Sequence, residues 1–332
     1  MIRLSAGTAA CLGLNGAKMD YYPTTAYLLA GSRCLMNCSF CPQGTSHGHN
    51  PAGSRLGRIS WPGYKWDKVK KVLTKARQQG VERICLQAVR HTDGIIKIQR
   101  HLAKIRSCSD LPISVSAWIS SVDDAGELLD SGAERIAISI DVVNPDAFRI
   151  FKGGQQENRI RLLLRCAEKY PGKISTHLIC GLGESEKEML SIINSFVSAG
   201  ITVGLFAFTP LKGTDLEKWV SPRIAVYRRV QIGYYLLNRG AASFDNFLFS
   251  GEKLISCGLT ENHLKKTLAD GLAFRTSGCP GCNRPYYNEH PGGDIYNYHY
   301  PPGNEQISAA TKESGLLKQY SYSTPRAEVN KC

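Results

Sequence analysis

The chain has 332 residues, of which 42% are hydrophobic and 21% charged, enough for one barrel-sized α/β unit or two small domains. This composition excludes a wholly disordered chain, and no apolar run approaches the roughly 20 residues that a membrane span needs. Its 41 basic and 28 acidic residues give a net charge of +13, which favours an acidic partner. The first residues make a poor secretory signal, so a cytoplasmic location is expected.

Strand-length apolar runs alternate with amphipathic helical patterns from Thr24 to about Phe208. This alternation predicts an α/β fold with a parallel sheet built from βα units. Six strands are expected, over Thr25–Ala30, Arg83–Ala88, Ile113–Ala117, Arg135–Ile140, Ile174–Cys180 and Thr202–Phe208. Helices are expected between them, over Trp66–Gln79, Asp93–Cys108, Asp123–Ser131, Glu157–Tyr170 and Glu186–Ala199.

The pattern changes after the sixth strand. Helices are predicted over Pro222–Asn238 and Glu261–Ala269, and the stretch Phe244–Gly258 is ambiguous. The segment Ser277–Pro302 is too rich in Cys, Pro, Gly and Tyr for a regular helix, and the polar remainder predicts a mobile tail. The expected domains are an N-terminal extension (1–22), a barrel (23–220), a C-terminal region (221–301) and a flexible tail (302–332).

Three of the twelve cysteines, Cys34, Cys38 and Cys41, follow the first predicted strand with the spacing C-x3-C-x2-C. A closed structural zinc site requires four ligands. Three thiolates on a [4Fe-4S] cluster instead leave one iron open to a cofactor or substrate. The spacing therefore favours a [4Fe-4S] cluster with an open iron over a structural zinc site.

This motif, with an aromatic residue (Phe40) before the last cysteine, resembles the hallmark of the radical SAM superfamily. The resemblance implies a partial TIM-type (β/α)6 barrel that holds the cluster and S-adenosylmethionine at the C-terminal ends of its strands. It also implies that the reduced cluster cleaves S-adenosylmethionine to a 5′-deoxyadenosyl radical, which abstracts hydrogen from an unactivated carbon.

The same resemblance implies the residues that contact S-adenosylmethionine. The segment from His177 to Glu184 resembles the family's G-x-I-x-G-x-x-E strand, with His177 in place of the first glycine. At the end of the second strand, Gln87 stands where the family often has Gly-Gly-Glu. The expected contacts are Phe40, Gln87, Ser139, Asp141, His177, Ile179 and Gly181.

A second motif, Cys279-Pro-Gly-Cys282, follows the barrel. A C-x2-C pair chelates one metal centre through a tight turn, which Pro-Gly forms here. A zinc knuckle would need two more ligands, and His290 and His299 are too widely spaced for the usual pattern. The motif therefore favours a second, auxiliary [4Fe-4S] cluster over a zinc knuckle, with Cys85, Cys257 and Ser277 as candidates to complete the cluster.

Several stretches, among them Arg83–Ala88 and Thr209–Leu216, resemble the biotin synthase branch of the superfamily. Biotin synthase needs cysteines on three barrel strands, and only Cys85 matches, with Ser114 and Ser175 at the other two positions. The N-terminal residues and the stretch around Cys279 and Cys282 resemble the two-component lipoyl synthases instead.

That resemblance implies sulfur insertion into an octanoyl chain on a lipoyl-carrier protein, with the auxiliary cluster as the sulfur donor. It also implies a second paralogous radical SAM subunit and an electron donor such as ferredoxin or flavodoxin, with neither nucleic acid nor membrane as partner. Alternatives are another radical SAM enzyme forming C–S or C–C bonds on a small molecule, a tRNA methylthiotransferase, and a non-enzymatic zinc or iron–sulfur scaffold.

Overall fold

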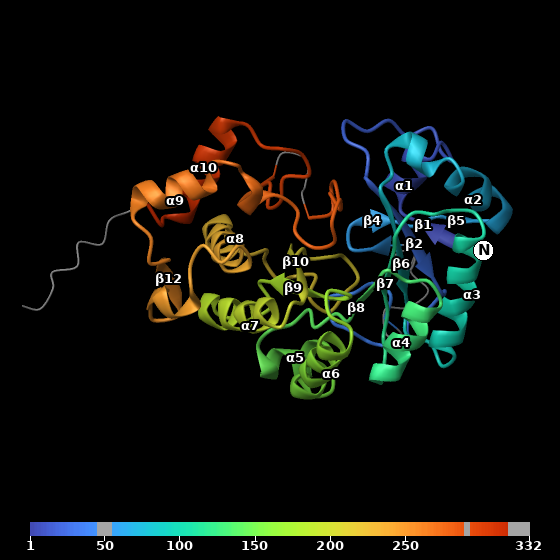
Figure 1. The fold of residues 1–332 in the computed structure, drawn as a ribbon, viewed down its shortest axis with the longest axis horizontal. Helices are drawn as coiled ribbons and strands as arrows, with labels where there is room; N and C mark the ends of the chain where they lie inside the picture. The colour runs from blue at the N-terminus through green and yellow to red at the C-terminus, as the bar shows by residue number, and fades with distance from the viewer. Residues whose placement is uncertain (45–54, 289–292, 318–332) are drawn as a thin grey trace, which may run out of the picture.

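The computed structural model describes residues 1–44, 55–288 and 293–317, and its centre is an eight-stranded sheet in the order β10-β9-β8-β7-β6-β2-β1-β5 (Figure 1). All neighbouring pairs from β10 to β2 are parallel, whereas β1 (Ile2–Leu4) runs antiparallel to β2 and to β5 (Gly63–Tyr64). The α/β prediction is therefore confirmed. The parallel strands are β2 (Thr25–Ala30), β6 (Arg83–Ala88), β7 (Ile113–Ser116), β8 (Arg135–Ala137), β9 (Ile174–Cys180) and β10 (Thr202–Ala207).

Helices follow these strands and cover the outer face of the sheet (Figure 1). The helix expected from Trp66 ends at Leu73 and is followed by a short 3-10 turn. Capping boxes at Ser121 and Ser185 fix where two helices begin, because the hydroxyls and the carboxylates three residues later satisfy backbone N–H groups that would otherwise be unpaired. The helices are α2 (Trp66–Leu73), α3 (Gly94–Arg106), α4 (Val122–Asp130), α5 (Pro145–Phe151), α6 (Gln156–Lys169) and α7 (Glu186–Ser198).

The C-terminal region packs beside α7, at the β10 end of the sheet (Figure 1). The ambiguous stretch forms a hairpin of β11 (Leu248–Ser250) and β12 (Lys253–Ser256). Helix α8 (Ile224–Asn238) packs against α7 and α10, and α9 (Glu261–Leu268) follows the hairpin.

The expectation of a flexible tail from residue 302 is wrong for α10 (Asn304–Ser314). The sequence of this helix is mostly polar, but one side of it is buried: Ile307 and Ala310, three residues apart, face the core. Residues 318–332 lie outside the described part of the chain. None of the helices described is long and apolar enough to cross a membrane.

Arg228 and Arg229 on α8 are both buried, unlike most charged side chains. Arg229 forms two hydrogen bonds to the Glu186 carboxylate, at 2.6 and 2.8 Å, and Glu186 also accepts the Leu254 N–H. Arg228 bonds to the carboxylate of Glu313 and to two backbone carbonyls. These charges therefore join α8 to α7, the hairpin and α10.

Glu186→Ala is expected to lower the free energy of unfolding by about 3–5 kcal/mol, because it leaves the Arg229 guanidinium buried without its counter-ion. Urea unfolding followed by circular dichroism measures the change. Glu261→Ala is the control, since its pair with Lys265 is solvent-exposed and should cost less than about 1 kcal/mol. Equal losses in the two variants would contradict a structural role for the buried pair.

Candidate active site

A cavity of about 310 Å³ lies against the inner face of the curved parallel sheet. Alternate residues of each strand face it, because side chains at i, i+2 and i+4 project from one face of a strand. The residues so placed are Thr25, Tyr27 and Leu29 on β2, Arg83, Cys85 and Gln87 on β6, Ser114 and Ser116 on β7, Ser175, His177 and Ile179 on β9, and Gly204 and Phe206 on β10.

The Cys34–Cys41 loop follows the C-terminal end of β2, and all three of its cysteines line the cavity. Backbone hydrogen bonds hold the loop in place: Ser39 N–H donates to Phe151 O (2.7 Å), and Leu216 N–H donates to Ser39 O (3.2 Å). Burial raises the pKa of the unligated Cys38 and Cys41 thiols to about 12. These half-buried thiols thus lie at the end of the barrel where an open-iron cluster is predicted.

Six of the seven residues expected to contact S-adenosylmethionine line this cavity, namely Phe40, Gln87, Ser139, Asp141, His177 and Ile179. Gly181 does not. Its φ of 104° places it in a left-handed turn, its N–H donates to Glu184 Oε1 (2.7 Å), and a Cβ there would come within 2.9 Å of Pro222. The glycine is therefore explained by the turn after β9 and a close approach to Pro222, and its expected cofactor contact is corrected.

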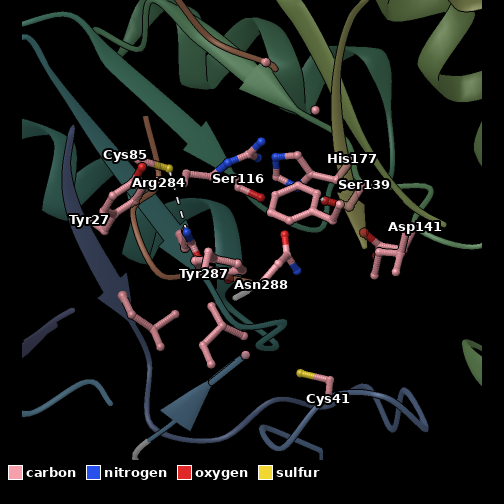
Figure 2. Close-up of a pocket in the computed structure, with 18 of the residues that line it drawn as sticks. Tyr27, Cys41, Cys85, Ser116, Ser139, Asp141, His177, Arg284, Tyr287 and Asn288 are labelled. Atoms are coloured by element: carbon pink, nitrogen blue, oxygen red, sulfur yellow. Dashed lines mark hydrogen bonds between the residues drawn. The ribbon is translucent and has the colours of Figure 1, made fainter. Parts of the chain in front are cut away.

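His177 occupies the position where the resemblance leads us to expect glycine, and its imidazole points into the cavity (Figure 2). Its Nδ1 lies 2.9 Å from Ser139 Oγ, and its ring meets Phe206 edge-on at 5.3 Å between centroids. Burial lowers the His177 pKa to about 4, so the ring is neutral at pH 7. The chain thus places a neutral hydrogen-bonding ring where the family pattern leaves space.

The His177 ring predicts a pH dependence of stability. Its pKa rises from about 4 in the fold to about 6.5 in the unfolded chain, so the unfolded state binds the extra proton between these values. Stability should be lost as pH falls from about 6.5 to about 4, by up to roughly 3 kcal/mol. His177→Gln should flatten this part of the thermal-unfolding profile, whereas the exposed-helix variant His263→Gln should not. Identical profiles for His177→Gln and wild type would refute the role of His177 in this pH dependence.

Asp141, at the end of the fourth parallel strand, is held by a buried lysine. Lys152 Nζ lies 2.6 Å from Asp141 Oδ2 and also donates to the carbonyls of Ser139 (2.5 Å) and Ile140 (3.1 Å). The Asp141 backbone has a φ of 62°, a conformation that aspartate tolerates better than most residues. Its carboxylate is therefore fixed at the cavity edge, where it can accept a hydrogen bond from a bound cofactor.

Cys279 and Cys282 line the same cavity, together with Cys85 of β6. Burial raises the pKa of the Cys85 thiol, and the neighbouring Cys279 and Cys282 thiolates raise it further, so the three sulfurs are close enough to interact. The structure therefore brings together three of the five residues proposed for the auxiliary cluster.

The other two auxiliary-cluster candidates, Cys257 and Ser277, do not line the cavity. Cys257 is buried in the core after β12, in the C-terminal region. Ser277 Oγ accepts the Leu205 N–H of β10 at 2.9 Å, which anchors the loop to the sheet. The expectation of a ligand at Cys257 is thus wrong for this fold, and Ser277 positions the cysteine loop.

The Cys279–Cys282 loop lies across the N-terminal ends of β2 and β6. Thr24 bonds to this loop twice, through its hydroxyl to Gly281 O and through its N–H to Asn283 Oδ1 (3.0 Å). Arg83 donates to Pro280 O at 2.9 Å. Because the first cysteine loop follows the C-terminal end of β2, the two cysteine groups lie toward opposite ends of the strands.

Three further residues line the cavity and were not predicted as site residues: Arg284, Tyr287 and Asn288. Figure 2 shows Tyr287 and Asn288 between Cys85 and Cys41. Arg284 lies over the Phe206 ring at 3.9 Å, and Asn288 donates to Ala207 O at 2.7 Å. Their position just after Cys282, in a segment that cannot be a regular helix, is the sequence feature that could have identified them as site residues.

No three His, Cys, Asp or Glu side chains in residues 1–44, 55–288 and 293–317 converge as they would on a single metal ion. A cubane cluster has a different requirement, since each thiolate binds a different iron. Each cysteine group supplies three thiols to one end of a buried cavity, a donor set that suits a cluster.

Comparison with known proteins identifies the family of the chain. The chain is 23% identical over 213 residues to an uncharacterized protein of Methanocaldococcus jannaschii and 22% identical over 198 residues to the GTP 3',8-cyclase of Limosilactobacillus fermentum. The matches cover 59% and 58% of this chain but only 56% of each relative. The chain therefore matches little more than half the length of these curated relatives.

Solved structures share the fold at low identity. Methylornithine synthase superposes with a TM-score of 0.53 at 14% identity, covering 88% of this chain and 81% of that one. The hydrogenase maturase HydG of Carboxydothermus hydrogenoformans gives 0.54 at 16%, covering 87% and 66%. The profile of the family described as "Radical SAM superfamily" matches residues 28–196, about half of the chain. The chain therefore belongs to the radical SAM superfamily, whose members use a [4Fe-4S] cluster and S-adenosylmethionine.

Proposed function

We propose that this chain is a sulfur-inserting radical SAM enzyme, a component of a lipoyl synthase that acts on an octanoyl chain attached to a carrier protein. The observation that carries the proposal is the placement of two cysteine groups, Cys34–Cys38–Cys41 and Cys85–Cys279–Cys282, toward opposite ends of one buried cavity. A substrate carbon held between them is within reach of a radical generator on one side and a sulfur source on the other.

When bound, the first cluster supplies the electron that cleaves S-adenosylmethionine, and the second supplies a sulfide and accepts one electron as the carbon–sulfur bond forms. The protein residues hold and orient these groups. Asp141, fixed by Lys152, and Ser139, paired with His177, offer oxygen atoms to the cofactor at the C-terminal end of the strands. Tyr287 and Phe206, in edge-on contact at 5.5 Å between ring centroids, help to exclude water from the middle of the cavity.

The substrate class follows from the cavity walls and the charge. Apolar side chains, including Leu29, Ile179 and Leu211, line the cavity and suit an acyl chain. The net charge of +13 suits an acidic carrier protein that delivers the chain on a lysine arm. A second radical SAM subunit and a ferredoxin or flavodoxin as electron donor belong to the same proposal.

The test is anaerobic incubation with octanoyl-lysyl peptide, S-adenosylmethionine and dithionite, with and without the second subunit, followed by mass spectrometry. A mass gain corresponding to sulfur on the octanoyl chain is expected. The Cys34→Ala variant is the control for background thiolation. Three other substrates are tested in parallel: GTP, a small molecule that accepts sulfur such as dethiobiotin, and tRNA. The alternative functions predict turnover of one of these substrates and no turnover of the octanoyl peptide.

Metal analysis separates the enzyme from a scaffold. A sulfur-inserting enzyme should contain roughly eight irons per chain and cleave S-adenosylmethionine to 5′-deoxyadenosine. A zinc scaffold would instead contain zinc and show no cleavage.

A further inference from the structure

Two hydroxyl groups lie against the sulfurs of the second cysteine group. Tyr27 Oη is 3.1 Å from Cys282 Sγ, and Ser114 Oγ is 3.4 Å from Cys279 Sγ. The sheet explains the arrangement, because Tyr27 of β2 and Ser114 of β7 are the register partners of Cys85 on either side of β6. The hydroxyls therefore flank one ligand and contact the other two.

We propose that Tyr27 and Ser114 donate hydrogen bonds to the cysteine ligands of the second cluster and thereby raise its reduction potential. The inference rests on the proposed function, which places a cluster on Cys85, Cys279 and Cys282. A phenol and an aliphatic hydroxyl both keep their protons at neutral pH, whereas an iron-bound thiolate has none. The hydroxyls are therefore the donors and the sulfurs the acceptors.

The direction of the effect follows from charge. A hydrogen bond withdraws negative charge from a ligand sulfur, which favours the reduced, more negative cluster and so raises its potential. Under the proposed function, formation of a carbon–sulfur bond between a substrate radical and a cluster sulfide would leave one electron on the iron of that cluster. Tyr27 and Ser114 would therefore favour sulfur transfer without touching the substrate, as positioning residues.

The test uses the full chain with Cys34, Cys38 and Cys41 replaced by alanine, so that only the second cluster contributes to the spectrum. Tyr27→Phe and Ser114→Ala are added singly, and redox titration monitored by electron paramagnetic resonance gives the midpoint potential. We expect roughly four irons per chain in every variant. The midpoint potential should be lower in both Tyr27→Phe and Ser114→Ala, and the decrease should be larger for Tyr27→Phe because the Tyr27 hydroxyl makes the shorter contact with sulfur. Tyr234→Phe is the matched control, because its buried hydroxyl bonds to Val203 O.

The outcomes separate this inference from the proposal on which it rests. If the chain that lacks Cys34, Cys38 and Cys41 contains no iron, the second cluster is absent and the proposed function is overturned. Full iron with unchanged midpoints in Tyr27→Phe and Ser114→Ala overturns only the donor role. Loss of iron in Tyr27→Phe with an unchanged melting temperature makes the phenol an iron ligand and also overturns it. If Tyr27→Phe fails to fold, the midpoint of Ser114→Ala decides the question.

Discussion

Replacement of Cys34, Cys38 or Cys41 by alanine is expected to reduce the formation of 5′-deoxyadenosine to the level of a reaction without enzyme. Three thiolates are the minimum that hold a cubane cluster and leave one iron open, so each single change removes the site. The second cysteine group lies at the other end of the strands and should keep its cluster, leaving roughly four irons per chain. Chromatographic measurement of 5′-deoxyadenosine and iron analysis test both statements.

Cys108→Ala is the matched control for these variants, because this half-buried thiol on the outside of the barrel does not line the cavity. It should retain full cleavage activity and iron. Cleavage that persists in any one of the three variants would overturn the assignment of this triplet as the radical-generating site.

The Cys279→Ala/Cys282→Ala double variant is expected to lose thiolated product while still cleaving S-adenosylmethionine. These residues hold the proposed sulfur source and not the radical generator, so iron should fall by about half, from roughly eight to four per chain. Mass spectrometry of the octanoyl peptide and 5′-deoxyadenosine analysis are run on the same reactions.

Two results would contradict this role of Cys279 and Cys282. Thiolated product from the double variant would show that sulfur comes from elsewhere. Zinc in the wild-type protein, with joint loss of solubility and both activities in the variant, would indicate a structural knuckle, because a metal-bound fold unravels with its metal.

The parallel sheet could be predicted because its signal is local. Strands that are buried on both faces appear in the sequence as short apolar runs. Strands β2, β6 and β9 begin and end at the expected residues. The loop cysteines and six of the residues expected to contact the cofactor line one cavity, because the C-terminal ends of parallel strands meet at one edge of the sheet. Gly181 was expected at the cofactor but lies in a turn, because glycine is as common in turns as at ligand contacts.

The remaining misses depend on contacts between distant residues. Neither the half-buried Cys85 nor the buried Cys257 has a distinguishing local motif, and only the path of the chain shows that Cys85, and not Cys257, faces the cavity. Arg228 and Arg229 resemble surface charges until α7 and α10 supply their partners. The buried face of α10 likewise depends on its packing against α8, which the polar sequence of α10 does not indicate.

The bonds of Thr24 and Arg83 to the Cys279–Cys282 loop have a consequence for repair of the enzyme. Under the proposed function, each product consumes sulfide from the second cluster, which must then be rebuilt. The loop is joined to these strand ends by side-chain hydrogen bonds and is not itself a strand of the sheet. Under the same proposal, iron and sulfide would be delivered at the N-terminal ends of the strands, at the end of the barrel away from the loop that holds Cys34, Cys38 and Cys41.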